Sequence, residues 1–295
     1  MTKETRILIA MQKSGRLSEK SLELFKQSGI VINNGKRQLL YRIPELPIDI
    51  LFVRDDDIPM LVSEGTCDLG IVGSNVFKEV ELSKKDEEFN AAHFFSLGFA
   101  KCRLSLAVPE HFDFHSPQSI DGLRIATTYP CILKDFLKKN KLKCEVAVMS
   151  GSVEISPHLK ISDIICDIVS TGATLVENGM KEAYNIFDSE AIFIRNTKIS
   201  DEKLKIASKL VSRLDCALIA NKSKYVMLNA PKSKIKEITN LLPGSESPTI
   251  MPLADENKVA IHAVCSEPVF WDTMEKLKAA GASSILVLPI EKMML

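Results

Sequence analysis

Residues 48–75 read IDILFVRDDDIPMLVSEGTCDLGIVGSN, and this stretch carries the clearest signal of fold class. Its apolar run 48–53 predicts a buried strand. The three aspartates that follow, together with Pro59, predict the first turn of a helix, because acidic residues and an early proline favour that position. Gly65 is placed to end that helix, and residues 68–72 predict a second buried strand. A strand, a helix and a strand in this order are typical of a parallel α/β sheet.

The same alternation continues on both sides of this stretch. Further strands are predicted at 6–11, 103–108, 123–128, 144–149 and 191–195, and helices at 131–139 and 201–214. Ser18 is a candidate cap for a helix that Gly29 ends. No low-complexity linker separates the units, so we expect two hinged α/β lobes with the chain crossing between them more than once, as in periplasmic binding proteins. Lobe I is predicted to hold residues 1–97 with 188–220, and lobe II residues 98–187.

Residues 221–295 predict a separate small domain. Strands are expected at 224–229, 249–253, 259–264 and 284–288, and helices at 231–242 and 268–280. Pro231 stands at the first position of its helix, where proline is favoured. The order of these elements, β-α-β-β-α-β, is the ferredoxin-like arrangement. Such domains often act as ligand-sensing modules, so we expect a regulatory role for this one.

Composition and charge exclude several classes of protein. Lys plus Arg and Asp plus Glu number 38 each, so the net charge is zero, whereas dedicated nucleic-acid binders usually carry a basic surplus. No apolar run approaches the ~18 residues that span a bilayer, and the amino-terminal segment lacks the apolar core of a signal peptide. The 7 cysteines form no CxxC pair, which argues against a disulfide framework or a structural zinc site. We therefore expect a cytoplasmic protein that binds neither nucleic acid nor membrane.

The stretch 163–175, DIICDIVSTGATL, carries the strongest chemical signal. An apolar run leads into a loop of small residues, and a helix is expected to follow. The loop residues are Ser170, Thr171, Gly172, Ala173 and Thr174. Free backbone N–H groups at the start of a helix favour an anion, and the loop hydroxyls add donors. The Asp167 carboxylate can accept hydrogen bonds from sugar hydroxyls, so the whole stretch suits a phosphorylated ribose. A capped helix that binds no ligand has the same residue pattern.

Three other turns follow predicted strands. In the first, Lys13 and Arg16 lie beside Gly15, which lets the backbone approach a ligand closely. In the second, Arg54 stands at a strand end, where it can clamp an anion. The third follows strand 68–72. Turns of this kind at the carboxyl ends of strands line the crevice of open α/β sheets. Solvated turns, and acids that complement a helix dipole, give the same patterns.

No signature of covalent catalysis is found in the chain. The 5 histidines show neither an HExxH motif nor a paired spacing, and no GxSxG or Cys–His signature is present. We therefore expect no nucleophilic side chain in the reaction.

Several segments, taken in order, make essentially the whole chain resemble one family. They are RILIAMQKSGRL, PIDILFVRDDDIP, CDLGIVG, RIATTYP, SGSVEISP, DIVSTGATLVENG and GASSILVLPIEKMM. The chain resembles the long form of ATP phosphoribosyltransferase, the first enzyme of histidine biosynthesis. The resemblance implies condensation of ATP with 5-phosphoribosyl 1-pyrophosphate to N1-(5-phosphoribosyl)-ATP and pyrophosphate. It also implies a magnesium requirement, inhibition by histidine, and assembly into homodimers and hexamers.

The resemblance also assigns roles to residues. The segment from Asp167 to Thr174 would hold the ribose 5-phosphate and hydroxyls. The catalytic residues would be Lys13, Arg16 and Arg54, with Arg54 facing the pyrophosphate. Further substrate-binding residues would be Gly15, Asp68, Tyr129 and Glu154. The histidine-binding residues would be Asn229, Thr249, Val264 and Ser284. Some members have aspartate in place of Asn229, and an amide pairs with the histidine amine less strongly than a carboxylate does.

The residue chemistry fits this reaction. Displacement at the anomeric carbon of ribose passes through an oxocarbenium-like state, and adenine N1 attacks directly, so no strong protein base is needed. The site must align both substrates and neutralise the charge on the departing pyrophosphate. Three cationic side chains and Mg²⁺ are suited to this task, and Mg²⁺ would bind mainly through substrate phosphates and water.

Two other classes of protein share parts of the pattern. A solute-binding protein has the same two lobes, but the expected ferredoxin-like domain and the lack of a signal peptide speak against it. A ligand-regulated enzyme such as a prephenate dehydratase joins similar lobes to a similar module, but the phosphoribosyl loop would then be unexplained. Calorimetry with nucleotides and free amino acids distinguishes a solute-binding protein from the transferase.

Overall fold

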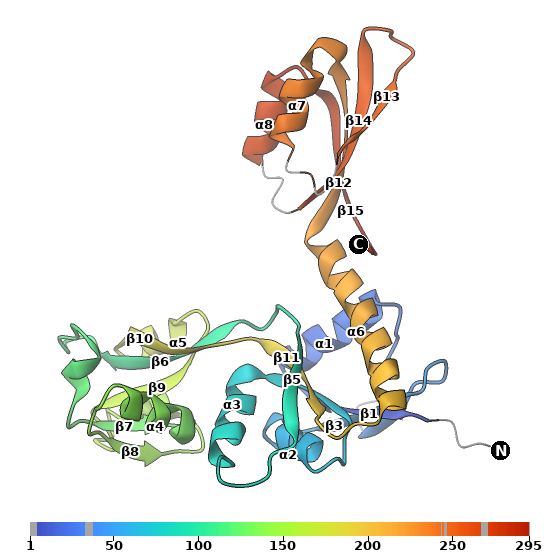
Figure 1. The fold of residues 1–295 in the computed structure, drawn as a ribbon. Coiled ribbons are helices and arrows are strands. Elements are labelled where there is room, and N and C mark those ends of the chain that lie inside the picture. The colour runs from blue at the N-terminus through green and yellow to red at the C-terminus, as the bar shows by residue number, and fades with distance from the viewer. Residues whose placement is uncertain (1–4, 33–37, 243, 245–246, 267–270, 295) are drawn as a thin grey trace. The chain divides into compact units, whose positions relative to one another are not determined.

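The described strands form three sheets of six, five and four strands (Figure 1). The computed structural model describes residues 5–32, 38–242, 244, 247–266 and 271–294. The chain divides into two compact units. Unit 1 comprises Met1–Leu22 with Ile32–Ser208 and holds the first two sheets; unit 2 comprises Glu23–Val31 with Lys209–Leu295 and holds the third. Two helices, α1 (Arg16–Gln27) and α6 (Asp201–Asn221), contribute residues to both units.

Lobe I of unit 1 is built on a six-stranded sheet in the order β2-β3-β1-β4-β11-β5. Its strands are β1 (Ile7–Gln12), β2 (Leu40–Arg42), β3 (Ile48–Val53), β4 (Leu69–Gly73), β5 (Ala91–Ser96) and β11 (Ala191–Asn196). Its helices are the 3-10 helix η1 (Asp55–Asp57), α2 (Ile58–Ser63) and α3 (Ser74–Ser83), together with the first part of α1. Strand β1 is parallel to β3 and β4, which confirms the parallel sheet predicted from 48–75.

The start of α1 differs from the prediction. The helix begins at Arg16, so Ser18 lies inside it with a buried side chain and is not its cap. The turn at Gly15 leads directly into the helix, and the backbone N–H of Glu19 donates to the Gly15 carbonyl at 3.0 Å. The helix therefore starts closer to the end of β1 than the position of the serine suggested.

Lobe II is built on a five-stranded sheet in the order β10-β6-β9-β7-β8. Its strands are β6 (Cys102–Pro109), β7 (Arg124–Thr127), β8 (Glu145–Val148), β9 (Ile164–Val169) and β10 (Met180–Ser189). Its helices are η2 (Pro117–Ile120), α4 (Pro130–Lys139), η3 (Val153–Ile155) and α5 (Ala173–Glu177). Apolar side chains of β6, β7, β9 and α4 form the core on one face of this sheet, and α5 packs on the other face.

The chain passes between the two lobes twice, once from β5 to β6 and once from β10 to β11. This confirms the predicted pair of α/β lobes that share the chain. The sequence pattern missed β2, β5 and β10, which all lie at sheet edges. Strand β2 has only three residues. Strands β5 and β10 carry register shifts against their neighbours, and β10 alternates poorly between buried and exposed residues, so the period-2 signal of a strand is lost.

The third sheet has the order β13-β14-β12-β15, and all neighbouring strands are antiparallel. Its strands are β12 (Ser223–Pro231), β13 (Thr249–Pro252), β14 (Lys258–Ser266) and β15 (Ser283–Pro289). The helices η4 (Lys232–Lys234), α7 (Ile235–Leu241) and α8 (Trp271–Ala279) complete the domain, and α7 and α8 cover one face of the sheet (Figure 1). The β-α-β-β-α-β order and this strand order confirm the ferredoxin-like arrangement. Residues 268–270 of the predicted last helix lie outside the described residues.

Helix α6 is longer than predicted, extending from residue 201 to 221 instead of ending at 214. Its length alone would suffice to cross a bilayer, but it carries many charged side chains. No helix among the described residues combines the length and apolarity that a membrane span requires.

Candidate functional site

The first part of the candidate site lies at the carboxyl ends of β1 and β3. The two strands are paired in register, with Gln12 opposite Val53, so the loops that follow them come together. The backbone N–H of Lys13 donates to the Val53 carbonyl at 2.9 Å and ties one loop to the other strand. Lys13 and Arg54, both predicted site residues, line one cavity of about 510 Å³. Gly15 follows in the same loop.

The turn after β1 depends on glycine. Gly15 has φ of +100°, a backbone conformation that other residues rarely adopt. This turn brings the chain from the strand into α1, whose first residue is the exposed Arg16. Arg16 follows the cavity-lining residues in sequence but does not itself line the cavity. Its side chain is exposed to solvent.

The cavity contains acidic as well as basic side chains. Asp55 and Asp57 line it beside Arg54; Arg54 directly precedes η1, and the two aspartates are the first and last residues of that helix. Burial raises the pKa of the neighbouring Asp56, and the charges of Asp55 and Asp57 raise it further. The sequence pattern assigned these acids only to the dipole of a helix. In the structure Asp55 and Asp57 also line the same cavity as Lys13 and Arg54, so the cavity carries charges of both signs.

The second part of the candidate site is the loop between β9 and α5. Ser170, Thr171 and Thr174 are exposed there, and Gly172 has φ of +82°. The backbone N–H groups of Thr171 and Gly172 donate to no residue that the structure describes. Helix α5 has only five residues, so its dipole is weak, and the donors for an anion are mainly the loop N–H groups and hydroxyls.

Asp167 and Glu154 lie close together beside this loop. Asp167 is in β9, three residues before Ser170, and Glu154 is in η3. Burial raises the pKa of Asp167, and the Glu154 carboxylate raises it further, while the N–H of Ile168 opposes the shift. The two predicted residues are therefore brought together, and a ligand with several hydroxyl donors would stabilise their charges.

Tyr129 connects the two parts. It is the residue before α4, and its ring packs against the apolar cores of both lobes. Its hydroxyl accepts a hydrogen bond from Asn75 Nδ2 of lobe I at 2.8 Å. Burial raises the pKa of Tyr129, and the charges of Asp167 and Asp55 contribute to the shift. The Tyr129 hydroxyl is thus influenced by a carboxylate from each part of the candidate site.

The amino terminus of α4 is already occupied by a side chain from lobe I. The Glu79 carboxylate of α3 accepts hydrogen bonds from the backbone N–H groups of Cys131 and Ile132, at 2.7 and 2.9 Å. This satisfies two of the free N–H groups of the helix with a carboxylate. Burial and the hydrogen bond with Glu79 raise the pKa of the Cys131 thiol to about 11, so the thiol is neutral. These two N–H groups of α4 are therefore not available to an anionic ligand, unlike the N–H groups of Thr171 and Gly172 in the β9–α5 loop.

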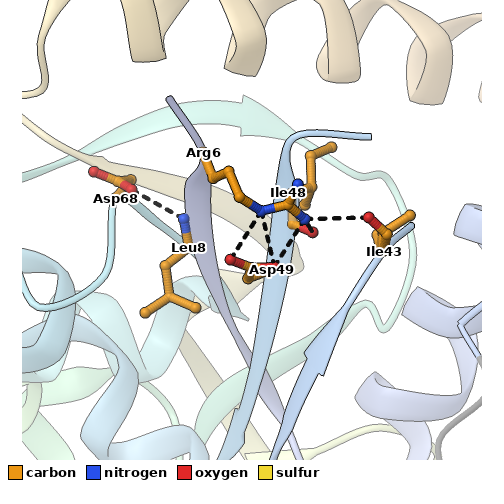
Figure 2. Close-up of polar contacts among 6 residues, drawn as sticks. All are labelled: Arg6, Leu8, Ile43, Ile48, Asp49 and Asp68. Carbon is orange, nitrogen blue, oxygen red and sulfur yellow. Dashed lines mark hydrogen bonds and ion pairs between the residues drawn. The ribbon is translucent and has the colours of Figure 1, made fainter. Parts of the chain in front are cut away.

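Asp68 does not lie with the other predicted substrate-binding residues. It precedes the first residue of β4, whereas the site is at the end of the sheet where β4 finishes with Gly73. Figure 2 shows the Asp68 carboxylate accepting a hydrogen bond from the N–H of Leu8 at 2.9 Å. Lys203 Nζ lies 2.9 Å from both carboxylate oxygens. The prediction placed the whole motif from Asp68 to Asn75 at one turn. Asp68 and Gly73 instead lie at opposite ends of β4, and therefore at opposite ends of its sheet.

A second polar cluster stabilises the same edge of the sheet as Asp68. Arg6 binds the Asp49 carboxylate, with Nη2 to Oδ1 at 2.9 Å, and donates to the carbonyls of Ile43 and Ile48 (Figure 2). This cluster joins the starts of β1 and β3. We interpret it and the Asp68 ion pair as structural, because they hold the sheet at the end opposite the site.

Three residues of lobe I and the crossing strand were missed as site residues. Asn75 and Glu79 both reach from α3 to the start of α4, and Ser189 at the end of β10 binds Asn75. The strand, glycine and helix pattern at 68–75 indicated a turn at this edge. Nothing in the sequence indicated which residues of the other lobe the helix would contact.

Three of the four predicted histidine-binding residues share one face of the third sheet. Asn229 is paired with Ala260, and Thr249 with His262. Ala260, His262 and Val264 alternate along β14 with the residues that pack against α7 and α8, so they face away from the helices. Ser284 lies at the start of β15 with φ of +50° and lines a cavity of about 530 Å³ beside Trp271.

Known proteins resemble the chain in both units. The family model described as ATP phosphoribosyltransferase (HisG) matches residues 54–216, and the model described as HisG, C-terminal domain, matches residues 220–292. A chain of the ATP phosphoribosyl transferase (HisG:HisZ) complex from Thermotoga maritima is 26% identical with a TM-score of 0.59, and the match covers 71% of this chain and 96% of that chain.

Two solute-binding proteins are more distant. The alkanesulfonate-binding protein SsuA from Xanthomonas axonopodis pv. citri is 14% identical with a TM-score of 0.46, and the match covers 73% of both chains. The periplasmic sulfonate-binding protein SsuA from Methylobacillus flagellatus KT is 12% identical with a TM-score of 0.48, and the match covers 72% of this chain and 68% of that chain.

Proposed function

Since the chain belongs to the ATP phosphoribosyltransferase family, we propose that it condenses ATP with 5-phosphoribosyl 1-pyrophosphate as the first step of histidine biosynthesis. The products are N1-(5-phosphoribosyl)-ATP and pyrophosphate. The observation that carries the proposal is the family match over 54–216, which includes Arg54, Tyr129 and the β9–α5 loop. These are the residues around which the site is built.

The β9–α5 loop is the proposed site for the ribose 5-phosphate. Its free N–H groups and hydroxyls supply donors, and Gly172 and Ala173 let the backbone approach the phosphate closely. The Asp167 carboxylate, at the end of the preceding strand, accepts hydrogen bonds from the ribose hydroxyls. Glu154 lies beside Asp167 and is the second acceptor on this side of the proposed site.

Lys13, Arg16 and Arg54 are proposed to act on the pyrophosphate. As the bond between the anomeric carbon and the pyrophosphate breaks, negative charge grows on the leaving group, and fixed cations lower the energy of that state. Adenine N1 is the nucleophile, so the chain need only hold it in line with the anomeric carbon. Tyr129 is proposed to contact the nucleotide, and Gly15 to let it approach the β1–α1 turn.

Magnesium is proposed as the metal of the reaction. In the part of the chain that the structure describes, no three His, Cys, Asp or Glu side chains gather into a metal site. We propose that Mg²⁺ is held mainly by substrate phosphates and water, since it keeps several waters and often uses few protein ligands. When bound, it would neutralise phosphate charge. Asp55 and Asp57 are the acids that line the adjoining cavity.

The ferredoxin-like domain is proposed to bind histidine and to lower the activity. The family match over 220–292 supports this role, and Asn229, Thr249 and Val264 share one sheet face, with Ser284 at a bulge nearby.

We also propose that the chain acts in the cytoplasm as a homodimer or hexamer. The Thermotoga maritima relative is a HisG:HisZ complex, so assembly is a property of that protein.

The proposed function is tested by incubating the protein with ATP, 5-phosphoribosyl 1-pyrophosphate and Mg²⁺ and following phosphoribosyl-ATP by mass spectrometry and pyrophosphate release. Arg54→Ala should lower turnover by about 100-fold or more, since loss of one preorganised charge-stabilising group commonly has that effect. Arg42→Ala removes an exposed arginine of β2 and is the control. Arg42 lies opposite Asp49 in the strand register, near the start of β3 and at the end of the sheet away from the proposed site, so turnover should be unchanged.

Two outcomes would contradict this account. A folded wild-type protein that forms no phosphoribosyl-ATP would overturn the proposed function. Near-normal turnover in folded Arg54→Ala protein would leave the function standing but remove Arg54 from the mechanism.

A further inference from the structure

A buried hydrogen-bond chain crosses the junction between the two lobes. It begins at Ser74 and Asn75, the first residues of α3, passes through Ser189 at the end of β10, and ends at Tyr129 of lobe II. Asn75 and Ser189 are only 7% and 5% exposed. The residues come from three separate segments of the sequence, so these hydrogen bonds form only in the folded protein. It ends beside the proposed nucleotide site.

Backbone N–H groups, which can only donate, occupy an acceptor position on each of the two serines. The N–H of Glu190 donates to Ser74 Oγ at 3.2 Å, and Ser74 Oγ donates to Ser189 Oγ at 3.1 Å. Ser189 Oγ also accepts the backbone N–H of Asn75 at 3.0 Å. Both acceptor positions of Ser189 are then filled, and its proton goes to Asn75 Oδ1 at 2.7 Å.

The Asn75 amide is oriented to match these bonds. With Oδ1 held by Ser189, Nδ2 faces lobe II and donates to the Tyr129 hydroxyl oxygen at 2.8 Å. The hydroxyl thus accepts a bond on the lobe I side. It donates none to any residue that the structure describes, so its proton points elsewhere.

We propose that Ser74, Ser189 and Asn75 are positioning residues that make the Tyr129 hydroxyl a hydrogen-bond donor to an acceptor atom of the bound nucleotide. The proposal rests on the proposed function, because it takes ATP as the ligand at Tyr129. The ring of Tyr129 is fixed by packing against the cores of both lobes, so only the hydroxyl proton remained to be oriented. Burial raises the pKa of Tyr129, which keeps that proton in place at neutral pH.

Asn75→Asp is the decisive variant, because it keeps the size of the side chain and reverses one hydrogen bond. The new carboxylate accepts from Ser189 and from Tyr129, so the tyrosine proton turns away from the ligand. KM for ATP should rise about tenfold, the loss expected for one hydrogen bond, while kcat and the KM for 5-phosphoribosyl 1-pyrophosphate change less than twofold. Tyr129→Phe should show the same split, and the double variant should be no worse than Tyr129→Phe.

Asn140→Asp is the matched control. Asn140 ends α4, and its Nδ2 donates to the Phe136 carbonyl within the same helix, far along α4 from Tyr129. The same chemical change there should leave KM for ATP unaltered. If Asn75→Asp does not fold by circular dichroism, Ser189→Ala replaces it, since loss of the Ser189 proton frees the amide to turn over and should also raise KM for ATP.

The proposal is overturned if folded Asn75→Asp keeps the wild-type KM for ATP, or if its effect adds in full to that of Tyr129→Phe. Additive effects would mean that Asn75 acts on stability or packing and not through the hydroxyl. A wild-type protein that neither binds ATP by calorimetry nor forms product would overturn the proposed function itself. The proposed role of the hydrogen-bond chain would then be overturned as well. The wild-type arm therefore separates the two failures.

Discussion

Carboxylate side chains of unit 1 differ in how well donor groups around them compensate their negative charge. Asp68 is paired with Lys203, and Glu79 accepts two backbone N–H groups, so each charge has a donor partner. Asp167 is half-buried, and its pKa is raised by burial and by Glu154, with the Ile168 N–H acting in the opposite direction. A charge held against its surroundings in this way is typical of a functional residue.

Asp167→Asn should stabilise the protein at neutral pH and impair it as an enzyme. Because the folded state raises the pKa of Asp167, the folded protein binds the proton more tightly than the unfolded chain, and stability falls as pH rises above the unfolded value of about 3.9. The asparagine side chain does not titrate, so the variant does not lose this stability as pH rises. Urea unfolding should show a more stable variant at pH 7 and a difference that closes in acid, while turnover falls at least about tenfold with the lost hydrogen bonds to ribose.

Equal or lower stability of Asp167→Asn at pH 7 would contradict this reading of its burial. Unchanged turnover would contradict its role toward the ribose. Asp163→Asn, at an exposed position before β9, would not serve as a control because its carboxylate accepts the Arg124 N–H. Asp86→Asn, at an exposed turn of lobe I, is the suitable one and should change neither property.

At the level of elements, α3 of lobe I contacts lobe II through two polar side chains. Its second residue, Asn75, donates to Tyr129, and one turn later Glu79 caps α4. Two N–H groups at the start of α4 thus find their acceptor in the other lobe. The sequence placed α4 almost correctly, from 131 instead of 130, because proline and the apolar spacing are local signals. Its cap is remote in sequence and could not be seen.

Glu79→Ala should lower the free energy of unfolding by about 1–2 kcal/mol, because two helix N–H groups lose a carboxylate cap. Chemical denaturation measures the change. Glu81→Ala, on the same helix, removes a carboxylate that pairs only with Lys78 at the surface, and should cost less than about 0.5 kcal/mol. An equal, small effect of both variants would mean that the cap contributes nothing to the fold.

At the scale of the whole molecule, the proposed catalytic and histidine-binding residues fall in different units. Inhibition by histidine would then be allosteric, a coupling between two distinct sites. Helices α1 and α6 contribute residues to both units, and α1 begins at Arg16 beside the proposed catalytic turn. Each helix is therefore a covalent connection between the two units.

Asn229→Asp should make the protein more sensitive to histidine. A carboxylate pairs with the histidine amine more strongly than an amide does, and a charge-assisted hydrogen bond exceeds a neutral one by enough for roughly a tenfold gain in affinity. Initial rates at increasing histidine concentration measure the shift. Asn240→Asp, on the exposed side of α7, is the control and should leave the inhibition curve in place. No shift with Asn229→Asp would show that this residue does not meet the amine.

The sequence by itself determined the order of most strands and helices, the ferredoxin-like domain and the loops that follow β1, β3 and β9. These depend on periodicity, turn residues and local backbone preferences, which a residue shares with its near neighbours in the chain. The tertiary structure decided that Asp68 leaves the site while Gly73 reaches it, since only strand direction separates them. It alone joined Ser74 to Ser189, 115 residues apart, and Asn75 to Tyr129, 54 apart. Contacts at such separations arise from how the lobes pack, and no local pattern in the chain encodes them.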